Sequence, residues 1–366
     1  MDLLSALSGL RAEPRIWCLA GPWSLLTWDV EPASLDDLPE PAGAGTPDGT
    51  GWTRFTGGHL LQADYEGAID VVRVRSALVW GPDGALHRIG EPRPPVPGAA
   101  AVPRLAGGLI PAWDGAAHAA KVDALRARIA AGDCYQVNLT LPFSGTLAAG
   151  DDLDAALALL TRSPAPFAAF IRRPGRPSVV SHSPECFVAT AGADIVSSPI
   201  KGTRRADDPD DLLAAEKDRA ELAMIVDLVR NDLGRVAEAG SVRVTEPARL
   251  LRLPYVRHLV ADVAARLRPG TTWRGILAAA FPAGSITGAP KAKAMELIRG
   301  CEAGPRGAYC GTFGWIGAEA AQLAVDGARV TLRAGSGIVA DSDGGAEWDE
   351  VRAKASAMAA ALGGSV

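Results

Sequence analysis

A run of 21 residues, EPRPPVPGAAAVPRLAGGLIP at 91–111, divides the chain into two parts of different character. Pro, Gly and Ala dominate this run, and because its Pro and Gly residues interrupt both helices and strands, we expect a linker or a long crossover. Before it, the segments WCLAG, SLLTWDV and DVVRVRSALVWG have the composition of strands. A shorter break at 40–51 has the composition of a surface loop.

After the break, helical and strand patterns follow one another irregularly. Residues 116–131 repeat apolar side chains at helical spacing and end at Gly132-Asp133, and residues 210–236 form the strongest helical segment. The segments SVVSHSPECFVATAG and ADIVSSPI are predicted to form a pair of strands. Because strands and helices do not alternate strictly, the pattern favours an α+β fold over a doubly wound sheet.

The composition excludes several classes of protein. A net charge of −5 and a pI of about 5.6 argue against nucleic acid as the principal ligand. The five cysteines lack metal-binding spacing, no signal peptide is evident, and no apolar run reaches the length of a membrane span. We therefore expect a cytoplasmic protein that binds neither nucleic acid nor a membrane.

Two helical segments carry carboxylate pairs three residues apart. Asp218 and Glu221 lie in EKDRAELAMIVDLVRNDLGRV, and Glu347 and Glu350 lie in AEWDEVRAKASAM. A single pair of this kind ordinarily belongs to a solvated helix face. If the fold brings the two pairs together, they form a hard oxygen site suited to Mg²⁺, and Lys354 one turn later tempers its negative charge.

Two glycine-containing segments and one lysine attract attention for a different reason. FPAGSITGAPKAKAMELI is predicted as a turn running into a helix with Pro290 near its first turn, a junction suited to an anion, although the spacing is not that of a P-loop. AGSGIVADS is predicted as a second glycine turn. In SSPIKGTRRA, Lys201 stands where we expect a turn, and a lysine in a turn is ordinarily a solvated surface charge.

In their order along the chain, eight segments resemble the chorismate-binding enzyme family. They are DCYQVNLT, SHSPECF, PIKGT, KDRAELAMIVDLVRNDLGRV, RHLVADV, FPAGSITGAPKAKAM, RGAYCGTFGWIG and AGSGIVADSDGGAEWDE. The resemblance implies an α+β fold in which mixed or antiparallel sheets pack as a sandwich with helices outside. It also implies a variable N-terminal part over 1–112 and a chorismate-binding catalytic part over 113–366.

Lys201 bears on which activity the resemblance implies. Anthranilate synthases typically carry Pro-Ile-Ala-Gly-Thr at this place, whereas component I of aminodeoxychorismate synthases carries Pro-Ile-Lys-Gly-Thr, as this chain does. The resemblance therefore implies Mg²⁺-dependent amination of chorismate to aminodeoxychorismate, for para-aminobenzoate and folate. We expect the Lys201 amine to add to the ring as hydroxide leaves, and ammonia then to displace it. Burial or a neighbouring cation should lower the pKa of this amine.

The resemblance assigns the other roles residue by residue. Glu185 matches the general acid/base that helps the hydroxyl leave. Glu221 and Glu350 match the Mg²⁺ ligands, with Asp218 and Glu347 acting through water. The positions around the substrate's ring and carboxylates are matched by Thr203, His258, Thr287, Tyr309, Gly335 and Gly337. Relatives that use water as the nucleophile carry a lysine where this chain has Gln136, which argues against water here.

The interval AEAAQLAVDGARVTLR departs from the family pattern. The family has a strand such as Ile-Ala-Ile-Arg-Thr there, and its arginine pairs with a substrate carboxylate. Aligned from the left, Arg329 takes the arginine's place. Aligned from the right, Asp326-Gly327 forms a hairpin turn and Gln322 takes that place. Either alignment predicts that one strand is missing.

The source of ammonia and two other interpretations stay open. The chain has no glutaminase-like cysteine motif and no length for an amidotransferase domain, so a separate glutamine amidotransferase subunit is expected to supply ammonia. The alternatives are anthranilate synthase component I, which eliminates pyruvate, and a catalytically impaired homologue that still binds the amidotransferase. The departing interval is what favours the last of these.

Overall fold

The structure is a computed structural model that describes residues 1–40, 55, 57–162, 164–209, 211–254, 256–315, 322–326 and 329–366. The predicted loop at 40–51 lies almost entirely outside this part. In residues 1–112, the predicted N-terminal part, the elements are α1 (Leu3–Ser8), β1 (Ile16–Ala20), β2 (Ser24–Ala33), the 3₁₀ turn η1 (Leu35–Asp37), β3 (His59–Ala63), β4 (Ile69–Trp80), β5 (Leu86–Ile89), β6 (Arg104–Leu105) and β7 (Ile110–Pro111).

The rest of the chain mixes helices and strands. In order, the elements are α2 (Gly115–Ala130), β8 (Gln136–Ala149), α3 (Asp152–Arg162), β9 (Phe167–Arg172), β10 (Ser178–Ser183), β11 (Cys186–Ala191), β12 (Asp194–Ser198), β13 (Ile200–Arg205), α4 (Glu216–Gly234), β14 (Arg243–Arg252), β15 (Val256–Arg266), α5 (Trp273–Ala280), α6 (Gly284–Thr287), β16 (Gly288–Ala289), α7 (Lys291–Cys301), β17 (Thr312–Gly314), β18 (Gln322–Asp326), β19 (Arg329–Ile338) and α8 (Gly344–Ala361).

Two sheets organise these elements. Counted over the described residues, the larger has 14 strands, with the central order β16-β8-β19-β18-β10-β9-β1-β2-β4-β3-β17, and β5, β6 and β7 join beside this path. The smaller has the order β11-β12-β15-β13, with β14 also paired to β15. The pairing of β1 with β9 and of β3 with β17 is antiparallel, so strands from both sides of residue 112 share one sheet.

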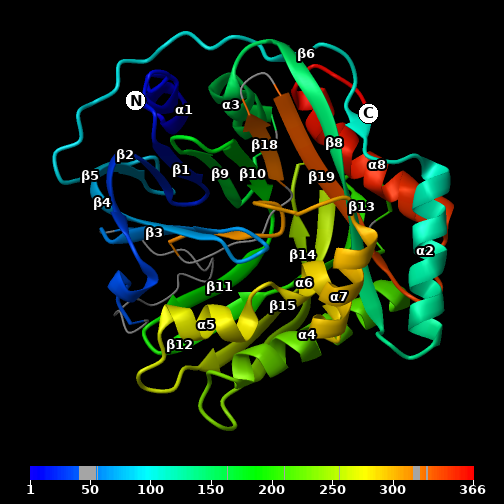
Figure 1. Cartoon of the computed structure of the whole chain (residues 1–366). Helices are drawn as coiled ribbons and strands as arrows, with labels where there is room; N and C mark the ends of the chain where they lie inside the picture. The colour runs from blue at the N-terminus through cyan, green and yellow to red at the C-terminus, as the bar shows by residue number, and fades with distance from the viewer. Residues whose placement is uncertain are drawn as a thin grey trace.

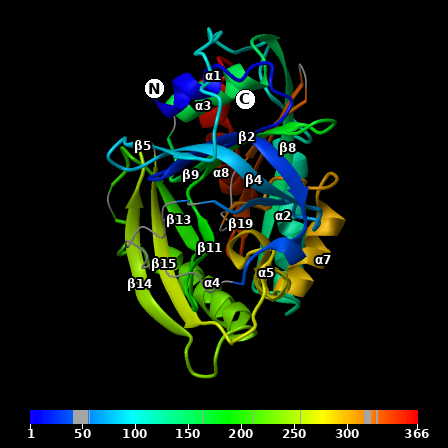
Figure 2. The ribbon, with the colours of Figure 1, turned by 90° about the vertical axis from the view of Figure 1, so that its left-hand side faces the viewer.

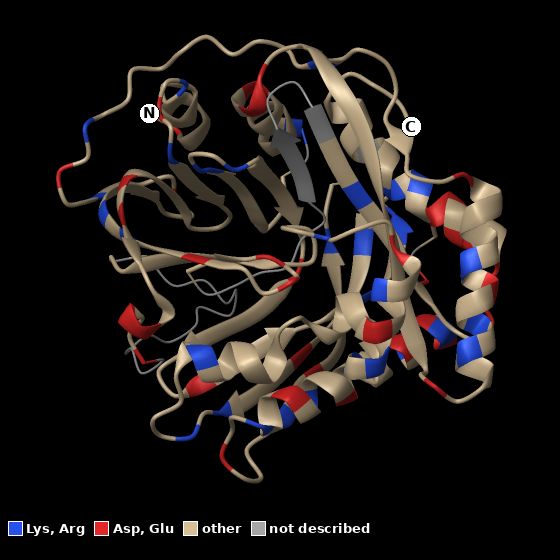
Figure 3. Ribbon diagram, in the orientation of Figure 1, with Lys and Arg blue, Asp and Glu red and all other residues tan. Residues whose placement is uncertain are grey.

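The helices cover the outside of the sheets, as Figures 1 and 2 show. α2 and α8 lie against each other beside β19, and α3 packs on β9 and β10. α4 packs on β15 of the smaller sheet, and α5 packs against α4. Acidic and basic residues are mixed along α2 and α7 (Figure 3), as solvent-facing helices require. This architecture confirms the predicted α+β fold with packed antiparallel sheets and outer helices. None of the described helices is long and apolar enough to cross a bilayer.

The helix α4 shows how the apolar pattern positions functional side chains. Leu222, Ile225 and Val229 are buried at helical spacing on one face, and the last two belong to the same core cluster as Val263 of β15. This packing fixes the N-terminal end of α4 beside β13, because Asp218 approaches the backbone there. The carboxylates of this end are therefore held in place by an apolar face one turn away.

Most elements predicted from sequence are present, with two corrections that concern the site. The helices expected at 116–131 and 210–236 are confirmed by α2 and α4, and the segment 91–103 contains no regular element. The turn expected at Lys201 is wrong, since the residue lies inside β13. The glycine turn expected at 334–342 is also wrong in part, because Gly335 and Gly337 lie within β19.

Candidate active site

Three polar side chains converge at Gly337, where β19 pairs with β8. A Cβ atom built on Gly337 would lie 2.4 Å from Gln136 Nε2, 3.1 Å from Asn138 Oδ1 and 3.3 Å from Lys201 Nζ. Only a residue without a side chain leaves room for these groups, which explains the glycine. The register pairs Gly337 with Asn138, so the close approach is set by the sheet itself.

Lys201 reaches this point because of an irregularity in β13. Its neighbour Gly202 has φ of +70°, and the pairing of β13 with β15 shifts register between Lys201 and Thr203. Such bulges re-aim a side chain that regular alternation would send elsewhere. Burial lowers the pKa of the Lys201 amine, and the ammonium of Lys354 lowers it further, while Glu221 opposes both effects. The predicted lowering of this pKa is therefore present, with burial as its main cause.

Glu185 lies between β10 and β11 and is 9 % exposed. Burial raises its pKa to about 7, although a hydrogen bond from Ser285 and the charge of Lys201 both oppose the shift. The hydroxyl of Ser285 donates to Glu185 Oε1 at 2.5 Å. A carboxyl group with such a pKa exchanges its proton near neutral pH, as a general acid/base must.

The amide of Gln136 is the most conspicuous unsatisfied group beside Lys201. The residue is fully buried, and neither Nε2 nor Oε1 has a hydrogen-bond partner in the described part of the chain. Buried polar atoms of native proteins nearly always have partners. The cost of leaving both atoms unpaired indicates a place where a bound molecule completes the hydrogen bonding.

The carboxylates at the N-terminal end of α4 face the same region. Burial raises the pKa of Glu221; the charge of Lys201 opposes this, and the carboxylates of Asp218 and Glu347 raise it further. These groups are therefore near enough to repel one another. Asp218 itself accepts a hydrogen bond from Arg204 Nη2 at 2.8 Å, which engages one of its oxygens.

The carboxylates of α8 complete the acidic side of the site. Glu347 Oε1 accepts a hydrogen bond from Ser342 at 2.6 Å, whereas its buried Oε2 has no partner among the described residues. Glu350 Oε1 accepts one from Lys354 Nζ at 2.6 Å. Burial acts to raise the pKa of Glu350, but the ammonium of Lys354 outweighs it and the pKa is lowered.

These carboxylates suit Mg²⁺ only in an open arrangement. Within the described ranges, no three carboxylate, histidine or cysteine side chains converge closely enough to cage an ion. Mg²⁺, however, commonly binds one or two carboxylates and keeps waters or substrate oxygens as its other ligands. The unpartnered Glu347 Oε2 and the raised pKa of Glu221 fit such a site, and the assignment of Glu221 and Glu350 as ligands stays a prediction.

Two further predicted residues lie together on β13 and β15. Thr203 Oγ1 and His258 Nδ1 are 3.1 Å apart, and the two residues are direct partners in the sheet. Burial, together with the charge of Lys354, lowers the pKa of His258 to about 4, so the imidazole is neutral near pH 7. Lys354 Nζ also donates to the carbonyl of Gly335 at 2.9 Å, which places its charge at the predicted substrate-binding glycines.

Thr287 and Tyr309 are placed by local structure. Thr287 is fully buried at the end of α6, and its hydroxyl donates to the carbonyl of Ala283 at 2.8 Å, leaving its oxygen free to accept. Burial raises the pKa of Tyr309 well above its ordinary value, so the phenol stays protonated. Both hydroxyls are therefore suited to neutral hydrogen bonding.

The interval that departs from the family pattern contains its strand after all. β18 pairs with β10 and with β19, and Asp326 lies opposite Arg329. The expectation of a missing strand is wrong, and the alignment from the right is favoured. In the same register Arg329 lies beside Thr146, six residues before Gly335 and therefore about 20 Å away along the strand. Its backbone position does not support the carboxylate-binding role assigned to it.

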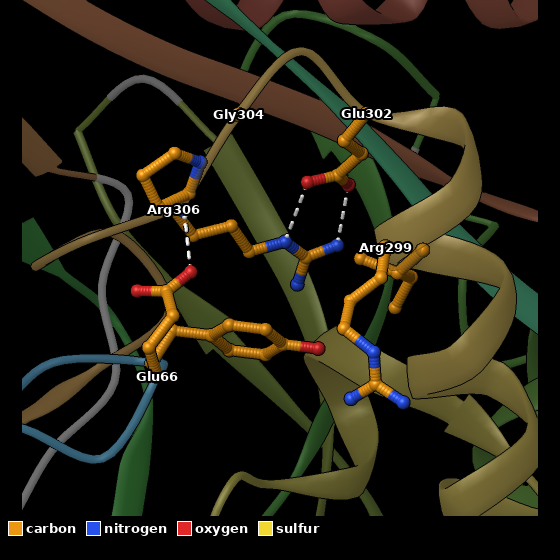
Figure 4. Close-up of a pocket in the computed structure, with 8 residues that line it drawn as sticks. Glu66, Arg299, Glu302, Gly304 and Arg306 are labelled. Carbon is orange, nitrogen blue, oxygen red and sulfur yellow. Dashed lines mark hydrogen bonds and ion pairs between the residues drawn. The ribbon is translucent and has the colours of Figure 1, made fainter.

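Two arginines of the described chain, Arg333 and Arg306, already have partners at Glu302 and at backbone carbonyls. Arg333 Nη2 donates to the carbonyl of Pro305 at 2.6 Å, and its Nη1 lies 3.5 Å from Glu302 Oε2. Arg306 forms two hydrogen bonds with Glu302, at 2.9 Å and 2.6 Å (Figure 4). Lys354, which pairs with Glu350 and donates to the Gly335 carbonyl, is the cation that lies at the predicted substrate-binding glycines.

Two contacts of the site were not predicted. Ser285 hydrogen-bonds Glu185, and Asn138 Nδ2 donates to the Ser285 carbonyl at 2.5 Å, which joins β8 to α6. Both residues stand in segments that the sequence marks, DCYQVNLT and FPAGSITGAPK. Membership of those segments was the available signal, but only the fold shows which side chains meet.

Comparison with known proteins agrees with this geometry. A family model described as chorismate binding enzyme matches residues 93–360. Aminodeoxychorismate synthase component 1 of Klebsiella aerogenes is 45% identical over 242 residues, 62% of this chain and 53% of that protein. Anthranilate synthase component 1 of Streptomyces coelicolor is 40% identical over 259 residues, 66% of this chain and 50% of that protein. The chain thus spans about half the length of these curated relatives.

Solved structures show the same fold. Anthranilate synthase component I from Streptococcus pneumoniae matches with a TM-score of 0.75 at 25% identity, covering 94% of this chain and 90% of that one. The menaquinone-specific isochorismate synthase from Escherichia coli matches with a TM-score of 0.79 at 18% identity, covering 99% and 91%.

Proposed function

Because the chain belongs to the family of chorismate binding enzymes, we propose that it aminates chorismate to aminodeoxychorismate, as aminodeoxychorismate synthase component I. The observation that carries this proposal is Lys201, whose amine has a lowered pKa and lies beside the carboxyl of Glu185 and the free amide of Gln136. A surface lysine has none of these neighbours.

The chemistry begins with the neutral Lys201 amine. Its nitrogen forms a bond to the ring, and the hydroxyl leaves as water with the proton of Glu185. Ammonia then attacks the same ring system, the bond to Lys201 breaks, and a proton from the incoming ammonium passes to a base such as the Glu185 carboxylate. Two displacements keep the new amine on the face that the hydroxyl occupied, and each is easier than one direct substitution.

The unpaired groups around Lys201 orient this exchange. The Gln136 amide can donate hydrogen bonds through Nε2 and accept them through Oε1, and neither atom has a partner among the described residues. Because the amide is neutral and not basic, it can position the substrate or ammonia without removing a proton from it. The Ser285 hydroxyl holds the Glu185 carboxyl toward the site. We assign Gln136 and Ser285 as positioning residues on these contacts.

Substrate carboxylates are proposed to bind the polar rim of the site. Lys354 supplies the positive charge that the family takes from an arginine. Neutral His258 with Thr203, together with Thr287, Tyr309 and the glycines of β19, supply short-range contacts. A single mobile ammonium binds a carboxylate less specifically than a bidentate guanidinium, so we expect a higher KM for chorismate than an arginine would give.

Mg²⁺ is proposed as the cofactor, held by Glu221 and Glu350, with Glu347 and Asp218 acting through water. When bound, it would neutralise a substrate carboxylate and hold it in one orientation. Glu221 supports this role because its pKa is raised by burial and by neighbouring carboxylates, a repulsion that a bound cation relieves.

The ammonia is proposed to come from a separate glutamine amidotransferase subunit, consistent with relatives named component 1. In that setting the product serves para-aminobenzoate and folate synthesis in the cytoplasm. Anthranilate synthase component 1 proteins are nearly as similar in sequence, at 40% identity, so anthranilate formation is the second candidate. The loss of the expected arginine keeps an impaired homologue as the third.

Product identity tests the proposal. Purified protein is incubated with chorismate, ammonium salt and Mg²⁺, and the products are separated by mass and absorbance. We expect aminodeoxychorismate without pyruvate release. Anthranilate with stoichiometric pyruvate would support the second candidate, and no turnover while chorismate still binds would support the third.

A further inference from the structure

A cavity of about 240 Å³ lies beside the C-terminal end of α7, separate from the groups that surround Lys201. Figure 4 shows Arg299 on one side of it and the Glu302–Arg306 pair on another. Its lining comprises Tyr65, Glu66, Ile298, Arg299, Glu302, Gly304, Pro305 and Arg306. Drug-sized ligands ordinarily need about 300–1,000 Å³, so an occupant of this cavity is small.

One wall of the cavity is rigid before anything binds. The Arg306 guanidinium makes two hydrogen bonds to Glu302 and others to the carbonyls of Ile286 at 2.8 Å and Asn138 at 3.0 Å. Its carbon lies 4.6 Å from the centre of the Tyr65 ring, a cation–π contact that fixes the ring. Little conformational entropy is therefore lost on this wall when a ligand binds.

Two polar groups of the lining have no partner. Tyr65 is 7 % exposed, and its buried hydroxyl oxygen forms no hydrogen bond among the described residues. Arg299 is exposed at the other side, and in the described part of the chain its guanidinium has no hydrogen bond or ion pair. An unsatisfied buried hydroxyl costs free energy that a ligand oxygen recovers.

The charges around the cavity favour an anion. Glu302 is neutralised by Arg306, and Arg333 adds a second positive charge 3.5 Å from the same carboxylate. Glu66 uses its two oxygens to accept the backbone N–H groups of Arg306 and Gly307. With Arg299, the three guanidiniums exceed the two carboxylates by one, and Arg299 is the group free to pair.

From this geometry we propose that the cavity binds a small aromatic carboxylate. The carboxylate accepts hydrogen bonds from Arg299 and from the Tyr65 hydroxyl, and the ring lies against the apolar surfaces of Ile298 and Pro305. An aromatic ring with one carboxylate matches both the size of the cavity and its surplus of one positive charge.

Binding is tested by titrating benzoate into the chorismate-free protein and measuring heat or saturation-transfer NMR. The parent should bind benzoate saturably and methyl benzoate, which lacks the charge, far more weakly. Arg299→Ala should weaken benzoate binding at least about tenfold, or about 1.4 kcal/mol, and Tyr65→Phe should also weaken it while keeping the ring. Arg88→Ala, at an exposed arginine of β5, is the matched control and should change nothing.

The proposal is overturned if benzoate does not bind saturably, or if it binds the Arg299→Ala and Tyr65→Phe proteins as tightly as the parent. The second result would place benzoate elsewhere, for example at Lys354. Since no turnover is measured, these outcomes do not depend on whether the protein aminates chorismate.

Discussion

Glu185 and Glu302 are both buried glutamates, and their surroundings are opposite. Glu302 accepts hydrogen bonds from Thr140 N and Oγ1 and from Arg306, and a second guanidinium, that of Arg333, lies 3.5 Å away. Glu185 accepts hydrogen bonds from the Ser285 hydroxyl and the Ile200 backbone but has no guanidinium partner among the described residues, and burial raises its pKa to about 7. One carboxylate is fully compensated and the other is held close to its protonation midpoint.

The difference separates a structural use of a buried acid from a chemical one. A fully compensated carboxylate, as at Glu302, links the end of α7 to β8 and β19. An incompletely compensated one costs folding free energy and is retained where proton transfer is needed. The Gln136 amide and Glu347 Oε2 are likewise buried without a hydrogen-bond partner among the described residues.

The largest effect is expected when the compensated cluster is broken. Glu302→Gln keeps the shape but leaves Arg306 and Arg333 without a countercharge, so the free energy of unfolding should fall by about 3–5 kcal/mol. Denaturation by urea measures this change. Glu296→Gln, on the exposed face of the same helix, is the control and should change it by less than about 0.5 kcal/mol. Equal small changes in both variants would refute the assigned role of Glu302.

Replacing Glu185 is expected to raise the free energy of unfolding, the opposite of the effect at Glu302. Its pKa is about 7 in the folded protein against an ordinary 4.5, so the folded state is favoured by the extra proton at low pH. That advantage is lost as pH rises from about 4.5 to about 7, and at higher pH the ionised carboxylate costs about 3 kcal/mol. Glu185→Gln should therefore stabilise the protein at about pH 8, with little effect at about pH 4.5.

The same variant should lower the turnover of chorismate by about 10²–10⁴-fold, because the amide cannot donate the proton to the leaving hydroxyl. Urea denaturation at the two pH values, with turnover in parallel, measures both changes. A Glu185→Gln protein that is less stable at the higher pH, or as active as the parent, contradicts the role given to Glu185.

Replacing Ser285, the hydrogen-bond donor to Glu185, is expected to have a smaller effect. Its hydroxyl donates to Glu185 Oε1 and so favours the ionised carboxylate. Ser285→Ala should raise the pKa of Glu185, and the alkaline fall of kcat/KM should move to higher pH. The stability cost should be about 1 kcal/mol, the value of one hydrogen bond. An unmoved pH profile would leave Ser285 with a purely structural role.

The sequence predicts the parts of the site that motifs and helical periodicity determine. The spacing in α4 places Asp218 and Glu221 correctly relative to the core, and the Pro-Ile-Lys-Gly-Thr segment identifies Lys201. The bulge that turns Lys201 inward was not predicted, because Gly202 in a strand is indistinguishable locally from a glycine in a turn. The roles of Ser285 and of the Gln136 amide depend on contacts between distant segments.

The departing interval shows the same limit. Local alignment predicted a missing strand and left Arg329 and Gln322 as alternatives for the arginine's place, whereas the pairing of β18 with β10 and β19 supplies the strand. In that register Arg329 lies opposite Asp326 and beside Thr146. Register is set by pairing across the sheet, which no local pattern in this interval reveals. The division of the chain at residue 112 stays a prediction.

Replacing Lys201 tests the proposed chemistry most directly. With ammonium, chorismate and Mg²⁺ supplied, Lys201→Ala should lower kcat at least about a hundredfold, or about 2.7 kcal/mol of activation free energy, while the Kd of chorismate changes little. Intact-mass analysis of the parent during turnover should show a covalent adduct that the variant lacks. An alanine variant that forms aminodeoxychorismate at the rate of the parent would contradict the assignment of Lys201 as the nucleophile.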